Sequence, residues 1–397
     1  MRAALVTFFV IIAFGKSLAN KTESMTISCL DLQSIPFVGT VITCTSTTHA
    51  SDLLVKFYLS TNKIRTPKEF GPCDLSKLQN YFDPLEETII IIHGYLANVK
   101  RDWIWDLKDR ILDAKKGNVI MVDWSKLSTR KNYVNAARNT VTATQQIFGF
   151  LQAIRSESKN FKFSVKKKKW NQIYFIGHSL GAQVSGQTAY LLKQDPFWHV
   201  NRITGLDPAK PCFTDVDPKL RVDKQDADFV DIIHTQVGYG GNTDAFGLTQ
   251  SIGHVDFYVN GGIVQSPCLG TVFTSEWSIM ICSHRIAYKF FAESLLNSIS
   301  GECKFLSYEW DGTYDDAVKS LNRKRTGSYC LDCPEMGIDT PKSTKRGDFL
   351  IITSTDVPYC EFKEKDTKTV LKVLRRLKFK KPLSITTLMP NTTTIQP

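Results

Sequence analysis

Short apolar runs alternate with segments of helical spacing between residues 85 and 206, a pattern typical of strand–helix–strand units. The stretches 103–112 and 136–154 contain few helix breakers and are predicted to be helices. Because strands and helices alternate, the pattern predicts an α/β fold with a mostly parallel central sheet flanked by helices. The predicted strands of this region are 88–92, 118–122, 173–176 and 203–206.

Later parts of the chain carry a weaker pattern. Apolar runs at 229–233 and 255–259 predict two more strands, whereas the chain beyond about Gly301 is rich in cysteine and charge and is expected to be irregular. No second large domain is predicted after Cys360. The expected organisation is therefore one large domain over residues 20–360 and a basic C-terminal tail over residues 361–397.

The first 19 residues have the features of a secretory signal peptide. Arg2 supplies a positive start, residues 5–14 are largely apolar, and the small residues Ser17 and Ala19 suit cleavage before Asn20. The apolar run is too short to cross a bilayer as a helix of ~20 residues, and no later segment is long and apolar enough. The protein is therefore predicted to be secreted and extracellular.

Ten cysteines in a secreted chain predict a disulfide framework. In that setting Cys330 and Cys333 are expected to belong to this framework and not to form a metal or redox site. The sequence does not pair the remaining early cysteines, and Cys212 is a candidate free thiol. Two glycosylation sequons begin at Asn20 and Asn391.

The net charge of +11 would suit an acidic partner, but it is unevenly placed. Residues 363–381 hold nine basic and two acidic residues, and the leader adds Arg2 and Lys16. The body of the chain is then close to neutral, and nucleic acid is not an expected partner.

The basic tail has three interpretations. On a helix, Val370, Val373, Leu374 and Leu377 form one apolar stripe among cations, which favours an anchor on an anionic membrane. On a strand, alternate residues of 371–379 would share an apolar face. A solvated, disordered tail is the third interpretation.

The strongest chemical motif is GHSLGA at residues 177–182, directly after the predicted strand 173–176. In the G-x-S-x-G pattern the glycines permit a sharp turn between strand and helix, which lifts the serine hydroxyl above the sheet. Ser179 is therefore predicted to be a catalytic nucleophile.

A serine nucleophile needs a histidine base, and the base needs a carboxylate to orient it. Asp207 ends the next predicted strand and is the preferred acid, although it could also be a turn aspartate before Pro208. The order serine, acid, histidine leaves three candidate bases. His234 and His254 could equally be hydrogen-bonded core residues, and His284 is predicted in a loop before a helix. The residue pattern alone leaves the choice of base open.

The oxyanion of an acyl-transfer intermediate needs backbone N–H donors. Leu180 follows the nucleophile directly and is the first candidate donor. Tyr95 follows the strand end His93–Gly94 and is the second candidate, although these residues could simply end a strand.

Taken together, the motifs resemble those of the animal pancreatic-lipase family, and most closely its secreted arthropod branch, the venom-type phospholipases A1. The resemblance covers about residues 85–360 and implies an α/β-hydrolase fold. It also implies a triad of Ser179, Asp207 and His284, with Tyr95 and Leu180 as the oxyanion hole. The matching motifs are HG at 93–94, VDW at 122–124, GHSLGA at 177–182, GLDPA at 205–209, GHVDFY at 253–258 and CSH at 282–284.

The resemblance further implies a lid closed by a disulfide between Cys268 and Cys282, which have 13 residues between them. Triglyceride lipases of the family have a longer lid and venom-type members a shorter one. A short lid suits a phospholipid head group better than a triglyceride droplet. Four lid residues are expected to present an apolar face to a lipid interface: Phe273, Trp277, Ile279 and Met280.

The implied activity is hydrolysis of the sn-1 acyl ester of glycerophospholipids, which is phospholipase A1 activity. A triacylglycerol lipase is the alternative enzyme, and a catalytically silent lipid-binding or storage protein is the alternative of another class. The expected partners are a phospholipid or lipid-interface substrate and a peripheral membrane surface. The chain after Cys360 is too short for the family's C-terminal β-sandwich, so no colipase-type partner is expected.

Arg221, Asp223 and Asp226 resemble the family's structural calcium loop, whose oxygen ligands suit that ion. Pro218 stands where the upstream acidic ligand is expected. We therefore expect no required cofactor, with these three residues as weak calcium candidates.

Overall fold

The computed structural model describes residues 54–71, 80–129, 132–158, 169–237, 245–270 and 275–379. Several predicted features lie outside these residues and are not tested by the structure. They are the signal peptide 1–19, the glycosylation sites Asn20 and Asn391, and Phe273 of the lid.

A single ten-stranded sheet runs through the described part of the chain, in the order β2-β1-β4-β3-β5-β6-β7-β8-β10-β9. The strands from β4 to β10 in this order are parallel, and β1, β2 and β9 join antiparallel at the two edges. This arrangement confirms the predicted α/β fold. The strands are β1 (Lys56–Thr61), β2 (Ile64–Phe70), β3 (Thr88–Ile92), β4 (Asn118–Asp123), β5 (Gln172–His178), β6 (His199–Leu206), β7 (Phe229–His234), β8 (Val255–Val259), β9 (Ser307–Glu309) and β10 (Gly347–Ile351).

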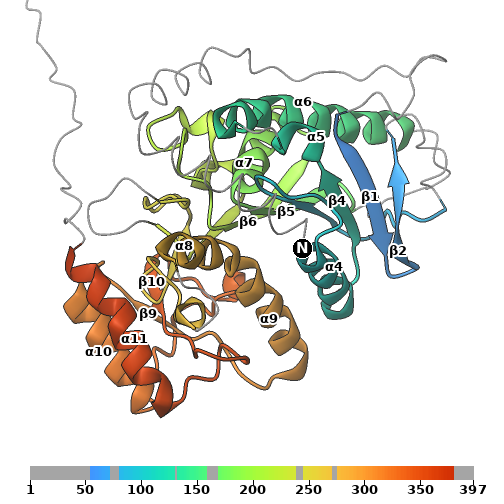
Figure 1. Cartoon of the computed structure of the whole chain (residues 1–397). Helices are drawn as coiled ribbons and strands as arrows, with labels where there is room; N and C mark the ends of the chain where they lie inside the picture. Colours follow the sequence, from blue (N-terminus) through green and yellow to red (C-terminus); the bar gives the residue numbers. More distant parts are fainter. Residues whose placement is uncertain are drawn as a thin grey trace, which may run out of the picture.

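Helices cover both faces of the sheet (Figure 1). Alternate residues of β3 show why: Ile90 and Ile92 join the apolar core beneath α6 and α7, whereas Ile89 and Ile91 join the core beneath α4 and α9. The helices are α4 (Asp102–Ala114), α5 (Ser125–Ser128), α6 (Tyr133–Ser158), α7 (Leu180–Leu192), α8 (Glu276–Arg285), α9 (Ala287–Ser300), α10 (Tyr314–Arg325) and α11 (Thr367–Leu374). Short 3₁₀ helices include η2 (Pro218–Leu220), η3 (Lys224–Asp226), η4 (Ser266–Leu269) and η7 (Arg375–Phe379).

The segment after Gly301 is more regular than the sequence suggested. It forms β9, α10 and β10, and β10 pairs in parallel with β8 from Gly347 opposite Val255 to Ile351 opposite Val259. The hairpin of β1 and β2 was also not predicted. Both omissions concern strands at or near the sheet edges, where exposed polar residues weaken the apolar pattern.

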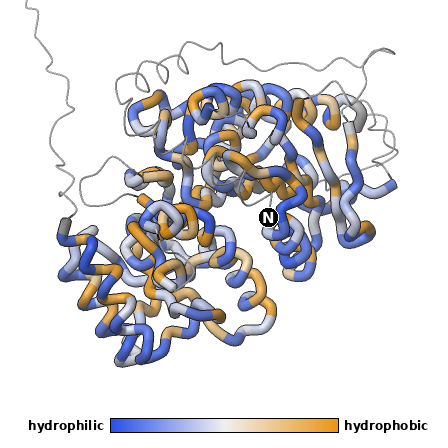
Figure 2. The backbone as a smooth tube through the Cα atoms, viewed as in Figure 1, coloured by the Kyte–Doolittle hydropathy of each residue, from blue (hydrophilic) through white to orange (hydrophobic). Residues whose placement is uncertain are grey.

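The basic tail is the main correction. Residues 361–379 belong to the folded body, so the predicted boundary at residue 360 is wrong for this segment. Val370, Leu374 and Leu377 lie in a core cluster with Tyr258 and Trp310, and Val373 is also buried. Figure 2 shows the resulting alternation of hydrophilic and hydrophobic stretches along α10 and α11. The helical interpretation of the stripe is right, but its apolar side chains face the protein and cannot insert into a membrane.

None of the described helices is both long enough and apolar enough to cross a bilayer.

Candidate active site

Ser179 stands on a strained turn between β5 and α7. Its backbone has φ 57° and ψ −122°, a conformation that residues with a side chain rarely adopt. A Cβ on Gly181 would lie 2.1 Å from the carbonyl oxygen of Ile92, and a Cβ on Gly177 would lie 2.4 Å from that of Gly181. The two glycines of the motif are therefore needed for close packing, which holds the serine above the sheet edge.

The structure brings the three predicted triad residues together. The Oγ of Ser179 lies 2.8 Å from Nε2 of His284, and Nδ1 of His284 lies 2.6 Å from Oδ2 of Asp207. Because an ionised carboxylate only accepts, Nδ1 of His284 donates to Asp207 and Nε2 is left to accept the serine proton. Ser179 is 6% exposed and Asp207 is fully buried, so the chain of hydrogen bonds is shielded from water.

Backbone groups fix the carboxylate of Asp207. Its Oδ1 accepts hydrogen bonds from the N–H groups of Thr235 at 2.8 Å and Gln236 at 3.1 Å, which leaves Oδ2 for His284. A Cβ on Gly247 would lie 2.5 Å from Oδ1, so only glycine fits beside the carboxylate. Sequence reasoning missed Thr235 and Gln236, because a backbone donor leaves no signature in residue type.

The other two candidate bases, His234 and His254, make their hydrogen bonds to other parts of the protein. His234 is buried between the carbonyl oxygen of Leu248 at 2.9 Å and Oδ1 of Asp256 at 2.8 Å. Nδ1 of His254 accepts a hydrogen bond from the N–H of Val230. His284 occupies the last turn of α8, so its predicted position in a loop is wrong although its proximity to Ser179 was expected.

The predicted oxyanion donors flank the nucleophile. A Cβ on Gly94 would lie 2.7 Å from Cβ of Ser179, which shows how closely the turn before Tyr95 approaches the serine. Leu180 is the first residue of α7, and the N-terminus of a helix favours negative charge. Burial raises the pKa of the Tyr95 hydroxyl to about 12, so this side chain stays neutral.

Trp124 holds the turn that carries Tyr95. Its indole Nε1 donates to the carbonyl oxygen of His93 at 2.7 Å. Burial raises the pKa of the neighbouring Asp123, but hydrogen bonds from His93 and Ser125 outweigh it and lower the pKa to about 2. The VDW motif at 122–124 thus holds His93, and with it the turn that carries the proposed oxyanion donor Tyr95. The sequence did not reveal this role.

The expected lid disulfide is present between Cys268 and Cys282. The second half of the lid is the start of α8, which Ser275 caps through a reciprocal bond with Ser278. The ring of Trp277 packs against Phe246 at 5.1 Å, and Phe246 packs against His284 at 5.3 Å.

The apolar lid face that was expected to meet a lipid interface is turned inward over its described part. Met280 is buried, and Ile279 packs against the core cluster that contains Leu374 and Leu377.

The remaining described cysteines confirm the disulfide prediction. Cys330 pairs with Cys333 and Cys303 pairs with Cys360. Cys212 is also disulfide-bonded, so it is not the free thiol for which it was a candidate.

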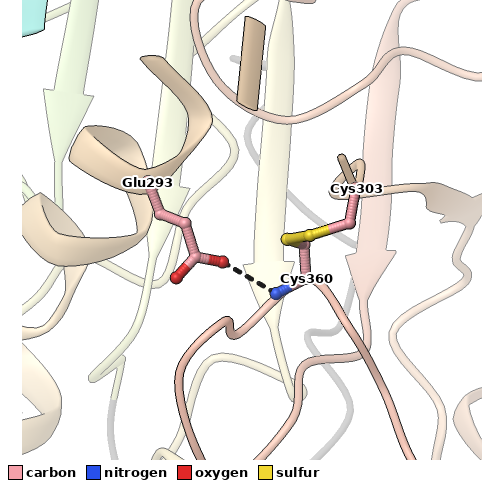
Figure 3. Close-up of side chains that lie close together, drawn as sticks. All are labelled: Glu293, Cys303 and Cys360. Atoms are coloured by element: carbon pink, nitrogen blue, oxygen red, sulfur yellow. Dashed lines mark hydrogen bonds between the residues drawn. A yellow bond between two sulfur atoms is a disulfide. The ribbon is translucent and has the colours of Figure 1, made fainter. Parts of the chain in front are cut away.

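Glu293 lies beside the Cys303–Cys360 disulfide (Figure 3). Its carboxylate accepts the backbone N–H of Cys360 at 2.9 Å, and burial raises its pKa. Both sulfur atoms are used in the disulfide, so this group of three residues offers no thiolate for a metal.

The predicted calcium loop forms a capped 3₁₀ turn. Nη1 of Arg221 lies 3.0 Å from Oδ2 of Asp223, whose Oδ1 accepts the N–H of Gln225. Oδ2 of Asp226 accepts the N–H of Asp223 at 2.8 Å. The guanidinium of Arg221 thus already pairs with Asp223, and we propose that no calcium ion is required here.

Removing calcium with EGTA is therefore expected to leave the melting temperature of the protein unchanged. Differential scanning fluorimetry in EGTA and in millimolar calcium tests this, with magnesium as the control for ionic strength. A melting temperature that rises with calcium and saturates would contradict the expectation, because an ion bound only to the folded state stabilises it.

A serine on a strained strand–helix turn of a mostly parallel sheet, hydrogen-bonded to a histidine that is itself bonded to an aspartate, is typical of an α/β-hydrolase, and the fold is of that class. Within that class the sequence is more specific. Residues 23–359 match the Lipase family, and the chain belongs to that family. The resemblance to the venom-type branch stays a prediction.

Three relatives illustrate the similarity. Pancreatic lipase-related protein 2 of Mus musculus is 32% identical over 265 residues, covering 63% of this chain and 49% of that protein. Pancreatic triacylglycerol lipase of Mus musculus is 30% identical over 253 residues, covering 61% and 52%. Inactive pancreatic lipase-related protein 1 of Canis lupus familiaris is 31% identical over 296 residues, covering 71% and 57%. The chain spans about half the length of these relatives.

Proposed function

We propose that the protein hydrolyses carboxylic esters of glycerophospholipids at the sn-1 position, as a phospholipase A1. The observation that carries the proposal is the continuous hydrogen-bonded chain from Ser179 through His284 to Asp207, at 2.8 and 2.6 Å. Family membership supports the ester-hydrolase chemistry, and the short lid between Cys268 and Cys282 supports the choice of phospholipid.

In the first half of the reaction, Oγ of Ser179 attacks the ester carbonyl carbon while Nε2 of His284 takes the serine proton. Asp207 stabilises the imidazolium that forms. The N–H groups of Leu180 and Tyr95 donate to the oxyanion. Collapse of the intermediate breaks the ester C–O bond, and His284 returns its proton to the leaving lysophospholipid alcohol.

In the second half, His284 removes a proton from a water molecule that attacks the acyl-enzyme. The bond to Ser179 breaks, the serine recovers its proton, and a fatty acid leaves. The products of one cycle are then one fatty acid and one 2-acyl-lysophospholipid, with one water consumed.

Product analysis tests the proposal on phosphatidylcholine with two distinguishable acyl chains, with trioleoylglycerol as the competing substrate. We expect release of the sn-1 fatty acid and accumulation of the 2-acyl-lysophospholipid. Cleavage of trioleoylglycerol alone would instead establish the triacylglycerol lipase.

Loss of both activities, together with no labelling of Ser179 by a phosphonate probe, would establish the catalytically silent alternative. One relative is named inactive, so this outcome is a real alternative. The hydrogen-bonded triad favours the active enzyme.

We propose that the protein binds a lipid interface, and that exposed cations attract it to anionic lipid. Lys368, Lys372 and Arg375 follow one another at helical spacing along α11 and the start of η7, and all three are exposed. None pairs with an acidic side chain of the described residues. Leu269 of the lid packs against the same cluster as α11, so these cations lie on an element that supports the lid. Faster hydrolysis of vesicles that contain anionic lipid would support the contact.

Secretion through the signal peptide, and the expectation of neither nucleic-acid nor colipase-type partners, also remain proposals.

A further inference from the structure

His178, the residue before the nucleophile, makes a second contact between the serine turn and helix α8. Its Nε2 lies 3.0 Å from the backbone carbonyl oxygen of His284. A carbonyl oxygen only accepts hydrogen bonds, so Nε2 of His178 must carry the proton and donate.

We propose that His178 is a positioning residue for the catalytic base: its Nε2–H bond to the His284 carbonyl ties α8 to the serine turn and sets the distance between the His284 ring and Ser179. This inference rests on the proposed function, because the position of His284 matters for turnover only if Ser179 is the nucleophile.

The backbone carbonyl of His284, at the end of α8, needs a hydrogen-bond donor from outside the helix. The helix ends at Arg285, and a carbonyl in its last turn has no N–H donor within the same helix. His178 supplies the donor from β5, the strand that leads into the nucleophile. The bond therefore joins the backbone that carries the base to the residue next to the nucleophile.

Two other contacts of this end of α8 join it to residues 265–268 and not to the serine turn. Cys282 is joined to Cys268, and Oγ of Ser283 accepts the N–H of Gln265 at 3.0 Å. Both contacts go to the segment before the lid and neither reaches β5 or α7. Among the hydrogen bonds of the described residues, only the His178 bond and the catalytic bond itself connect the Ser179 turn with His284.

The ring of His178 is held in one orientation. It lies edge-on to Trp103 at 5.9 Å and to Tyr288 at 5.3 Å, and those two rings stack on each other at 4.6 Å. His178 is 7% exposed. A donor fixed in this way loses little entropy on bonding and can define a position to within a fraction of an ångström.

The environment also keeps this donor neutral. Burial lowers the pKa of His178 well below its usual range, and the neighbouring His284 lowers it further. The two rings lie 4.8 Å apart. A positive charge at that distance would oppose the imidazolium that His284 must become during the reaction. A neutral N–H donor positions the base without that electrostatic cost.

Three variants separate the donor from the ring. His178→Gln places an amide nitrogen near the position of Nε2 and keeps the donor, whereas His178→Asn reaches only as far as Nδ1 and His178→Phe keeps the ring without a donor. We expect kcat on a soluble short-chain ester to fall roughly 10- to 100-fold for the Asn and Phe variants, with KM unchanged. His178→Gln should restore most of kcat, and phosphonate labelling of Ser179 should slow in the same order.

The readouts distinguish positioning from a structural role. A lost fold would lower the titrated fraction of active sites and the melting temperature, whereas a displaced base lowers kcat per titrated site. Wild-type kcat in folded His178→Asn or His178→Phe would overturn the inference and leave the proposed function standing. Equal loss in His178→Gln and His178→Phe would overturn it as well, since the donor would then be irrelevant.

A measurement on the unaltered protein covers the case in which the variants do not fold. Nitrogen-15 NMR of histidine-labelled protein reports which ring nitrogen carries the proton. We expect the Nε2–H tautomer for His178, and the Nδ1–H tautomer would overturn the inference without any substitution. If the wild-type protein neither turns over ester nor reacts with phosphonate, it is the proposed function that fails.

Discussion

Replacing Ser179 with alanine is expected to lower ester hydrolysis roughly 10⁴- to 10⁶-fold while the protein remains folded. The loss follows because the attacking oxygen is removed, whereas His284 and Asp207 keep their 2.6 Å hydrogen bond. Initial-rate measurements on phosphatidylcholine, with circular dichroism to check folding, give the answer. Residual catalysis is expected from the oxyanion donors and from substrate binding.

A matched serine variant provides the control. Ser320 is buried in α10, away from the triad, so Ser320→Ala removes the same atom without touching the site. We expect wild-type turnover from it and unchanged phosphonate labelling. Undiminished hydrolysis by Ser179→Ala would mean that another group carries the reaction.

Truncation after Cys360 is expected to unfold the protein. It deletes four buried apolar side chains of α11 and η7, and each contributes about 1.5–3 kcal/mol to the free energy of unfolding. The total is comparable with the roughly 5–15 kcal/mol by which domains are stable. Thermal unfolding and soluble yield measure the effect. The four residues are Val370, Val373, Leu374 and Leu377.

A second truncation, after Phe379, is the matched control. It keeps α11 and η7 and removes the rest of the chain, so we expect the melting temperature of the full protein. If both truncations behave alike, the packing of α11 against Tyr258 and Trp310 contributes nothing to stability, and the boundary predicted from the sequence would be restored.

The same segment shows where sequence reasoning stops. Val370 and its neighbours form an apolar stripe on any helix, but a stripe does not specify whether a membrane or another part of the protein covers it. The covering residues, Tyr258 and Trp310, lie far away in the sequence, and only the tertiary structure brings them to α11. The nine cations in this region then favoured the membrane interpretation.

The sequence predicted those parts of the site in which only one type of residue can do what is needed. The turn at Ser179 needs glycines at 177 and 181 because their missing Cβ atoms make room for backbone, and that demand is visible in the sequence. The groups that fix Asp207 are backbone amides of Thr235 and Gln236, which any residue could supply. His284 was predicted in a loop before a helix, but the cap at Ser275 starts an earlier helix that includes it.

Helix α8 contains both the second half of the lid and the catalytic base His284, so these two parts move as one rigid element. Each residue inserted into an α-helix turns everything beyond it by about 100°. A residue inserted between Ser275 and Cys282 would therefore rotate the lid residues before it by about 100° relative to Cys282 and His284, which keep their own register because both follow the insertion. Engineered lids of other lengths leave this helical register intact when the change is made on the Cys268 side of Ser275.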